Sequence, residues 1–308
     1  MYIKEMRQQM NLDASLKENV KHGTNENPIS GIHFFVGEGS SFPDHFFVER
    51  HWHHTIEIIY IVRGTYLFEI NLEEYVLKEG DLCFLNGEEL HQITGEGRGT
   101  IHDVLLFDPK ILEFTYPDEM EEQVIAPLIR HEKILPSVMR SHEPYYEEVL
   151  SIIKRLIDKS LKKQAGWYFS CKLGLLELVT FLSDRGLLLP AASSLSESDR
   201  QKIDRYKKLV SYMEKHYAEP VSLKELSEAV SCNPQYLCRF FKEITGTTPI
   251  QYLISIRLSH ACTLLRESTK SILEISLDCG FENTSYFIRK FRQQNGCTPR
   301  EYRVTVRS

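Results

Sequence analysis

Tyr236–Tyr252 reads YLCRFFKEITGTTPIQY, and Tyr286–Tyr302 reads YFIRKFRQQNGCTPREY. When the first stretch is shifted by 50 positions, seven of its residues coincide with the second. These pairs are Tyr236/Tyr286, Arg239/Arg289, Phe241/Phe291, Gly246/Gly296, Thr248/Thr298, Pro249/Pro299 and Tyr252/Tyr302. A shift of 49 just upstream also pairs Ser222 with Ser271 and Glu225 with Glu274. One structural unit therefore occurs twice, with a one-residue difference in its middle turn.

Each copy of the repeat has the pattern of a short helix, a tight turn and a longer helix. Ser222 and Ser271 each begin a capping box, because a Glu three residues later can bond back to the cap. The expected helices are Leu223–Val230 and Pro234–Thr245 in the first copy, and Ile272–Cys279 and Thr284–Asn295 in the second. The pattern predicts two helix-turn-helix units, whose second helix lies in the major groove of DNA.

The longer helix of each copy has one apolar and one polar face. Leu237, Phe241 and Ile244 recur at helical spacing and predict the buried side of the first. The residues left facing outward are Gln235, Cys238, Arg239 and Lys242 in the first copy, and Thr284, Ser285, Ile288, Arg289 and Arg292 in the second. Arg can bond bidentately to guanine, Gln to adenine, and Ile can touch a thymine methyl. These residues are the predicted DNA-binding set. The alternative is a solvated helix face, against which the duplication at matched positions argues.

Pro249–Leu265 lies between the copies and carries apolar residues at helical spacing. It predicts one long helix that fixes the distance between the two recognition helices. Two such helices on a rigid connector can occupy successive major-groove faces, about 34 Å apart along the duplex.

The net charge of -6 is unevenly distributed along the chain. From Asp199 onward there are 18 Lys and Arg against 12 Asp and Glu, whereas the preceding residues have 19 against 31. The part that contains the repeat is therefore basic, and the rest is acidic. This asymmetry indicates that only the C-terminal part meets a polyanion such as DNA.

Arg257–Arg303 closely resembles the signature of AraC/XylS-family transcription regulators. The match is carried by Gly280-Phe281, Phe287, Phe291, Gly296, Thr298-Pro299 and Tyr302-Arg303. The resemblance implies a seven-helix domain with two helix-turn-helix units, activation of transcription by RNA polymerase, and an N-terminal domain that binds an effector and dimerises. It also implies base contacts from Gln235, Cys238 and Arg239 in the first unit and Ser285, Ile288 and Arg289 in the second. Cys238 departs from the family pattern, because a longer polar side chain is usual there.

The N-terminal half has the pattern of short β-strands. Thr65–Ile70 alternates between apolar and polar residues, and Leu82–Leu85 and Ile101–Phe107 are rich in strand-forming residues. Turn residues separate such segments, which is typical of an all-β sandwich or barrel. Further strands are expected at Ile32–Val36, His51–Val62, Tyr75–Leu77 and His91–Thr94, with a loop at Gly37–Phe42.

From Pro144 the apolar period becomes helical. Two amphipathic helices, the second at Trp167–Leu182, are expected to pair with each other or with a second subunit. The chain is therefore predicted to divide into an effector-binding and dimerisation domain (1–185), a linker (186–198) and a DNA-binding domain (199–308). The predicted fold class is α+β: a cupin-like β-barrel with a two-helix dimerisation element, then an all-α domain.

The other informative stretch is His51-Trp-His53-His54-Thr-Ile-Glu57. In one continuous strand, His51, His53 and Glu57 would share a face, because side chains alternate with period two. His91 could add a third imidazole from a facing strand. These four residues are the predicted effector-binding set.

The stretch resembles the first motif of the cupin fold, and the segment from Gly80 to His91 resembles part of the second. Asn86 and Glu88 stand where Pro and Gly are usual. Three interpretations stay open. The polar groups can hydrogen-bond a small effector such as a sugar, they can hold a divalent transition metal such as Fe, Ni, Zn or Mn, or they form a structural barrel mouth. We expect the first, with no cofactor required and no residue assigned to a metal.

Cysteine usage and hydropathy argue against secreted and membrane-spanning proteins. Seven cysteines without CxxC spacing fit reduced thiols in a cytosol better than a disulfide framework. No apolar run approaches the roughly 20 residues that span a bilayer, and the charged N-terminal stretch is not expected to be a signal peptide. We expect a cytoplasmic protein with no membrane partner.

These observations predict an effector-responsive, sequence-specific DNA-binding transcription regulator that is not an enzyme. We expect an activator of carbohydrate or small-metabolite genes, acting as a homodimer, with promoter DNA, a small effector and RNA polymerase as partners. Two alternatives stay open: a cupin metalloenzyme fused to a DNA-binding domain, and a constitutive DNA-binding protein whose barrel only dimerises. Metal-dependent turnover would favour the former, and an operator affinity that no metabolite changes would favour the latter.

Overall fold

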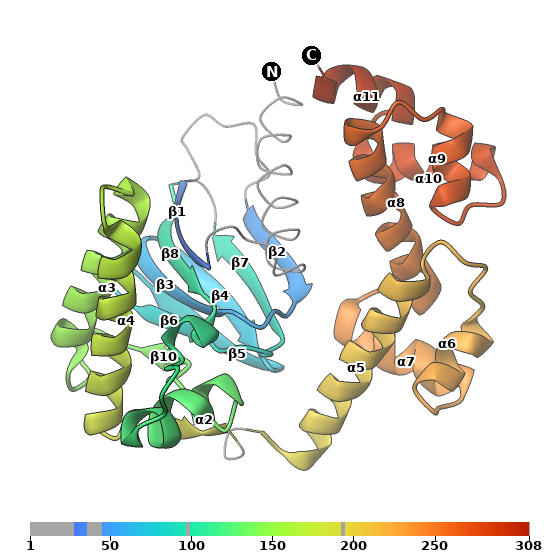
Figure 1. Ribbon diagram of the computed structural model, residues 1–308. Helices are drawn as coiled ribbons and strands as arrows, with labels where there is room; N and C mark the ends of the chain where they lie inside the picture. The colour runs from blue at the N-terminus through green and yellow to red at the C-terminus, as the bar shows by residue number, and fades with distance from the viewer. Residues whose placement is uncertain (1–27, 36–44, 97–98, 192–194, 308) are drawn as a thin grey trace. The chain divides into compact units, whose positions relative to one another are not determined.

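The computed structural model of the protein describes residues 28–35, 45–96, 99–191 and 195–307 (Figure 1). The expected loop Gly37–Phe42 lies outside these residues. The chain divides into two compact units, Met1–Ser196 and Glu197–Ser308.

The N-terminal unit is built on two antiparallel sheets, with strand orders β1-β8-β3-β6-β10 and β2-β7-β4-β5. The strands are β1 (Ile29–Phe35), β2 (His45–His51), β3 (Ile56–Arg63), β4 (Thr65–Ile70), β5 (Glu73–Lys78), β6 (Leu82–Leu85), β7 (His91–Glu96), β8 (Ile101–Phe107) and β10 (Val138–Met139). The bounds predicted for β4, β6 and β8 are confirmed. Within the described residues the two sheets share no strand, so the expected β-barrel is an open two-sheet sandwich.

The alternation of side chains along the strands fills two cores. Ile59 of β3 packs in one cluster with Phe68 of β4 and Ile93 of β7, so this core lies between the two sheets. Its neighbour Ile58 points to the opposite face, because successive side chains of a strand alternate. There it belongs to a cluster that includes Ile153 of helix α3. The first sheet is therefore buried on both faces.

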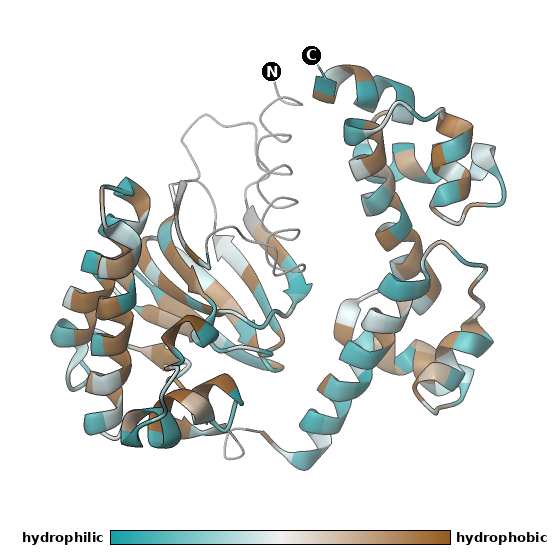
Figure 2. Ribbon diagram, in the orientation of Figure 1, coloured by the Kyte–Doolittle hydropathy of each residue, from teal (hydrophilic) through white to brown (hydrophobic). Residues whose placement is uncertain are grey.

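Helices α3 (Tyr146–Lys162) and α4 (Trp167–Asp184) lie side by side and cover that outer face (Figure 1). In Figure 2 hydrophobic and hydrophilic residues alternate around α3, as in an amphipathic helix. Gly174 of α4 allows the close approach, since a Cβ there would lie 2.7 Å from Cδ2 of Leu156. The two helices pair with each other, which is one of the two arrangements expected from the sequence.

Shorter elements complete this unit. They are the 3-10 helix η1 (Pro109–Leu112), the π-helical turn η2 (Glu121–Ile125), α2 (Ala126–Ile129) and the paired strands β9 (Lys133–Ile134) and β11 (Leu189–Pro190). Strand β11 falls within the expected linker, and it pairs with β9 of the N-terminal unit. Part of the expected linker therefore belongs to that unit. In the part of the chain that the structure describes, no helix is long and apolar enough to cross a membrane.

The C-terminal unit is all-α and is organised around its longest connector, α8 (Pro249–Glu267), which packs against every other helix of the unit (Figure 1). The other helices are α5 (Glu197–His216), α6 (Leu223–Ala229), α7 (Pro234–Thr245), α9 (Ile272–Asp278), α10 (Thr284–Asn295) and α11 (Pro299–Arg307). Residues 197–307 thus form seven helices, with α6–α7 and α9–α10 as the two helix-turn-helix units.

The two helix-turn-helix units are stabilised by equivalent contacts. An Asn at the start of each recognition helix accepts a hydrogen bond from the backbone N–H three residues later, at 2.8 Å in both copies. An aromatic residue of each recognition helix meets the tyrosine of the following helix edge-on. These pairs are Phe241–Tyr252 and Phe291–Tyr302, with ring centroids 5.2 and 5.5 Å apart. The repeat seen in the sequence is therefore a repeat in three dimensions.

Candidate nucleic-acid interface and histidine cluster

The polar face of α7 is open to solvent. Gln235, Arg239 and Lys242 are exposed, and Cys238 is half-buried. The buried side of the helix is formed by apolar residues at helical spacing: Leu237, Phe240, Phe241 and Ile244. The predicted core stripe of α7 is thus confirmed, with Phe240 added to it.

The polar face of α10 is narrower than the sequence indicated. Ser285, Arg289 and Arg292 are exposed, whereas Thr284 and Ile288 are half-buried. The Thr284 hydroxyl lies 2.9 Å from the Ser276 hydroxyl of α9. Ile288 packs against the apolar core of this unit. Both side chains therefore also serve the interior of the helix-turn-helix.

Arg239 and Arg289 have matched surroundings. The guanidinium carbon of Arg239 lies 5.8 Å from the ring centroid of Tyr236, and that of Arg289 lies 5.2 Å from Tyr286. A guanidinium is attracted to an aromatic face, so each tyrosine restricts the rotamers of the arginine one helical turn later. In the first copy Arg205 of α5 also donates to the Tyr236 hydroxyl, at 2.7 Å. The sequence placed these tyrosines in the repeat without assigning them a role, although their repeated spacing from an Arg was the available signal.

Arg257 of α8 links the segment after α5 to the second helix-turn-helix unit. Its Nε and Nη2 donate to the carbonyl oxygens of Tyr217 and Glu219, each at 2.7 Å. Its guanidinium carbon lies 5.8 Å from the ring of Phe281, in the turn of the second unit. Burial lowers the pKa of Arg257 from its ordinary value. The end of α5, the middle of α8 and the second turn are thereby fixed to one another.

The histidine cluster forms, but not on the single strand expected from the sequence. Strand β2 ends at His51 and β3 begins at Ile56, so His53 lies in the turn between them. The prediction of one strand from His51 to Val62 is therefore wrong. His91 begins β7 and stands opposite His51 in the β2–β7 register. Backbone pairing and the turn, rather than alternation, bring the rings together, with centroids 4.3 to 5.6 Å apart.

Each of the three rings is oriented by a carbonyl oxygen two residues away. The Nδ1 contacts are His51 to Glu49, His53 to Thr55 and His91 to Glu89, at 2.8, 2.9 and 2.8 Å. Glu57 joins the cluster through His53, whose Nε2 lies 3.2 Å from Oε2 of the carboxylate. All four predicted effector-binding residues are therefore together.

The loop between β6 and β7 positions His53. The backbone N–H of Glu88 donates to the His53 carbonyl at 2.7 Å. Glu88 has φ 65°, in the left-handed region that favours the glycine usual at this place in cupins. Asn86, which replaces the usual proline, bonds both the N–H and the C=O of Leu135, at 2.8 and 3.0 Å. These hydrogen bonds tie the loop to His53 and to Leu135.

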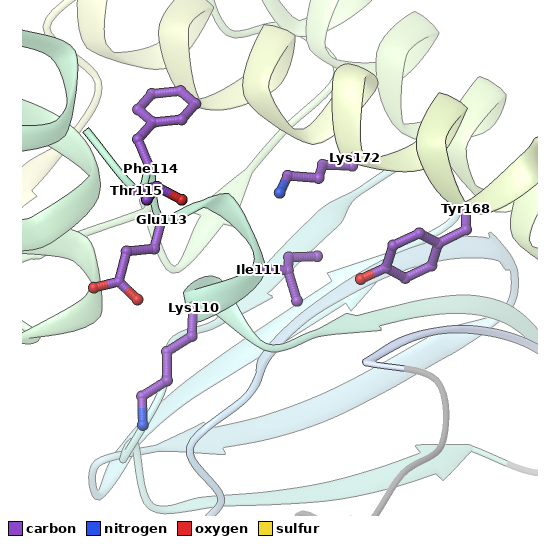
Figure 3. A pocket seen from close by; sticks show the side chains of 7 residues that line it. All are labelled: Lys110, Ile111, Glu113, Phe114, Thr115, Tyr168 and Lys172. Atoms are coloured by element: carbon purple, nitrogen blue, oxygen red, sulfur yellow. The ribbon is translucent and has the colours of Figure 1, made fainter. Parts of the chain in front are cut away.

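An open hollow of about 510 Å³ lies between α4 and the segment that begins with η1 (Figure 3). Tyr168 and Lys172 of α4 line one side of it. The remaining lining residues are Lys110, Ile111, Glu113, Phe114 and Thr115. The hollow shares no residue with the histidine cluster.

Two family models match the chain. A helix-turn-helix domain matches residues 226–305, and an AraC-like ligand binding domain matches residues 35–166, which contain the whole histidine cluster. The chain belongs to the AraC family of transcription regulators. As an AraC-family member it is a DNA-binding regulator whose ligand-binding domain precedes its DNA-binding domain.

Two relatives align with most of the chain, and a solved structure aligns with a third of it. The uncharacterised HTH-type transcriptional regulator YdeC of Bacillus subtilis is 25% identical over 293 residues, 95% of this chain and 97% of YdeC. The HTH-type transcriptional activator RhaS of Escherichia fergusonii is 28% identical over 258 residues, 82% of this chain and 87% of RhaS. A solved AraC-type transcriptional regulator from Chromobacterium violaceum is 35% identical, covers 33% of this chain and 92% of its own, and has a TM-score of 0.33. All three bear the names of transcription regulators.

Proposed function

We propose that this AraC-family protein is a ligand-responsive transcription activator that reads DNA through α7 and α10. The observation that carries the proposal is the pair of exposed arginines, Arg239 and Arg289, each resting on a tyrosine at the same place in a duplicated unit. Arg at such positions discriminates guanine through a bidentate bond in the major groove. The basic charge of the C-terminal unit adds the attraction for phosphate that DNA binding needs.

The ligand in this proposal is a small polar molecule or ion bound by His51, His53, Glu57 and His91. Three imidazoles and a carboxylate converge there, inside the part that matches an AraC-like ligand binding domain. The relative RhaS bears the name of a transcriptional activator, which supports activation as the output, and hence RNA polymerase as a partner. A sugar stays the predicted class among organic ligands. The histidine cluster in this proposal binds the ligand and does not catalyse its conversion.

The proposal includes a homodimer formed through α4. Phe169 and Leu173 are 66% and 51% exposed and stand one helical turn apart. An exposed apolar pair of this kind favours burial against a partner helix. We infer that this partner is α4 of a second copy, which offers the same apolar pair.

The test combines DNA selection with transcription. Sequences that the full-length protein binds are selected from a random pool, and binding is then measured with sugars, other polar metabolites and divalent metals. We expect a preferred sequence, a ligand that changes its occupancy, and stimulated transcription by RNA polymerase in a purified system. Equal affinity for all sequences would overturn the proposal of a sequence-reading regulator.

A further inference from the structure

The histidine cluster has the composition and convergence of a metal site. One ring nitrogen from each of His51, His53 and His91 lies within 4.8 Å of the other two. His91 is 1% exposed and His53 4%. Around a tetrahedral transition metal, nitrogen ligands stand about 3.3 Å apart, so closing the cluster on an ion takes side-chain movements of about 1 Å.

A backbone carbonyl oxygen faces Nδ1 of each ring, as it does in metal-binding imidazoles. A carbonyl oxygen only accepts hydrogen bonds, so each Nδ1 that faces one carries the proton, and in a neutral ring the lone pair then lies on Nε2. All three histidines make this contact. Nδ1 of His53 also lies 2.8 Å from the Thr55 hydroxyl, which can donate to it, so the carbonyl contact favours this tautomer most directly in His51 and His91. Metal-binding imidazoles are oriented in the same way, with one nitrogen donating to a carbonyl and the other coordinating. The repetition of this carbonyl contact in one cluster favours one shared ligand.

The position of Glu57 also favours a metal site. Its Oε2 lies 3.2 Å from Nε2 of His53, within hydrogen-bonding distance. A proton on Nε2 or a cation shared by the two atoms accounts for this approach. Two ligands with metal bonds of about 2.1 Å stand roughly this far apart.

We propose that His51, His53, His91 and Glu57 bind one divalent first-row transition metal, and that its occupancy sets the affinity of the protein for DNA. Three imidazoles and one carboxylate suit Zn, Fe, Ni or Mn rather than Mg or Ca. The second half of the proposal rests on the proposed regulatory function, whereas the first half does not.

Metal binding is measured on tag-free, chelator-treated, full-length protein by equilibrium dialysis with Zn²⁺ and by the visible absorption of bound Co²⁺. We expect one ion per chain, and at least 100-fold weaker binding in His53→Ala and His91→Ala. The matched control is His54→Ala, because His54 adjoins the cluster in sequence but pairs with Asp108 at 3.7 Å. It should bind as the wild type does. Equal binding by His53→Ala and His54→Ala would overturn the site.

A measurement on the unaltered protein guards against variants that misfold. With ¹¹³Cd²⁺ bound, the cadmium resonance should fall in the range of nitrogen and oxygen ligands and couple to three histidines. A protein that takes up no ion, with His53 and Glu57 as an imidazolium–carboxylate pair, would overturn the proposal.

DNA binding separates this inference from the proposed function. With selected DNA, chelation should change the wild-type affinity at least 10-fold and leave that of His53→Ala unchanged. One bound ion with no effect on DNA affinity would refute the regulatory half alone. Absence of an ion together with a response to an organic ligand would refute the metal site and leave the proposed function standing.

Discussion

Arg239 and Arg289 lie at the same place in the two recognition helices, exposed and held against a tyrosine ring. We predict that Arg239→Ala and Arg289→Ala each cost about 1–3 kcal/mol of specific DNA binding and relax the preference at one base pair. The control is Lys242→Ala, which should weaken binding to selected and random DNA alike, as a phosphate contact does. Affinities for selected and random duplexes check this, and an equal loss on both for the arginine variants would refute base reading.

Three capping glutamates make the C-terminal unit sensitive to acid. Glu225, Glu274 and Glu301 each accept from the backbone N–H of their helix N-cap, at 2.8, 2.7 and 2.8 Å. These hydrogen bonds lower the pKa of each carboxyl from the ordinary 4.5. Their contribution to stability is therefore present above that value and is lost as the pH falls through the folded-state pKa.

We predict that replacing all three glutamates by glutamine reduces the acid dependence of the melting temperature below about pH 5. Glutamine keeps the cap, since Gln251 accepts from the N-cap N–H of Thr248 in the native protein. Calorimetry of both proteins between neutral pH and pH 3 provides the comparison. Identical pH profiles would show that the caps do not titrate in this range.

The limits of residue-level prediction are clear at Thr284 and Ile288. Both fall on the polar side of α10 by helical spacing, and both are half-buried. A helical pattern describes one helix by itself, whereas burial here comes from a hydroxyl contact with α9 and from the core of the unit. Arg239 and Arg289 were found because they recur at matched positions.

The turns of the two helix-turn-helix units carry different residues at one equivalent position, and this position has a strained backbone in the first unit. Ser231 in the first turn has φ 52°, and Gly280 in the second has φ 76°. Only glycine adopts this region without penalty. A Cβ on Gly280 would also lie 2.6 Å from the carbonyl oxygen of Tyr217.

We predict that Ser231→Gly stabilises the C-terminal unit by about 0.5–1 kcal/mol, whereas Gly280→Ala destabilises it by about 1–3 kcal/mol. The two substitutions control for each other, because they change equivalent positions in opposite directions. Differential scanning calorimetry gives the shift of the C-terminal transition. A rise in melting temperature for Gly280→Ala would contradict the assigned geometry.

Elements with local signals were predicted, and those set by distant pairing were not. β4, β6, β8, α7 and α10 have the predicted bounds, because alternation, caps and terminal glycines act within each element. The break between β2 and β3 has no such signal. Residues 51–55 are set by the pairing of His51 with His91 and by the hydrogen bond between Glu88 and His53.

At the scale of the whole molecule, α4 offers a test of assembly. We predict that Phe169→Glu with Leu173→Glu dissociates the proposed homodimer, because charge on the exposed apolar pair opposes burial against a second copy. The control, Thr180→Glu, adds a charge at an exposed position of the same helix. Sedimentation velocity should show a monomer for the double variant and a dimer for the control. A dimer in both would place the interface elsewhere.

The two-part organisation and the DNA-binding class were predicted from the repeat, the charge asymmetry and the resemblance to AraC/XylS regulators. The chemical class of the ligand could not be predicted from the sequence, because the same three imidazoles and carboxylate fit both a polar molecule and a metal ion. The carbonyl oxygens that face Nδ1 of the three rings favour a metal ion bound through Nε2. Sequence spacing carries no information on tautomers.

The central claim is that one chain reads two DNA sites with two equivalent helices held apart by α8. This helix has 19 residues and is therefore about 28 Å long. The direct measurement is selection of bound sequences from random DNA by the wild type, Arg239→Ala and Arg289→Ala. We predict two conserved blocks about one helical turn apart, with each substitution relaxing a different block. A single block that both substitutions weaken equally would contradict the account.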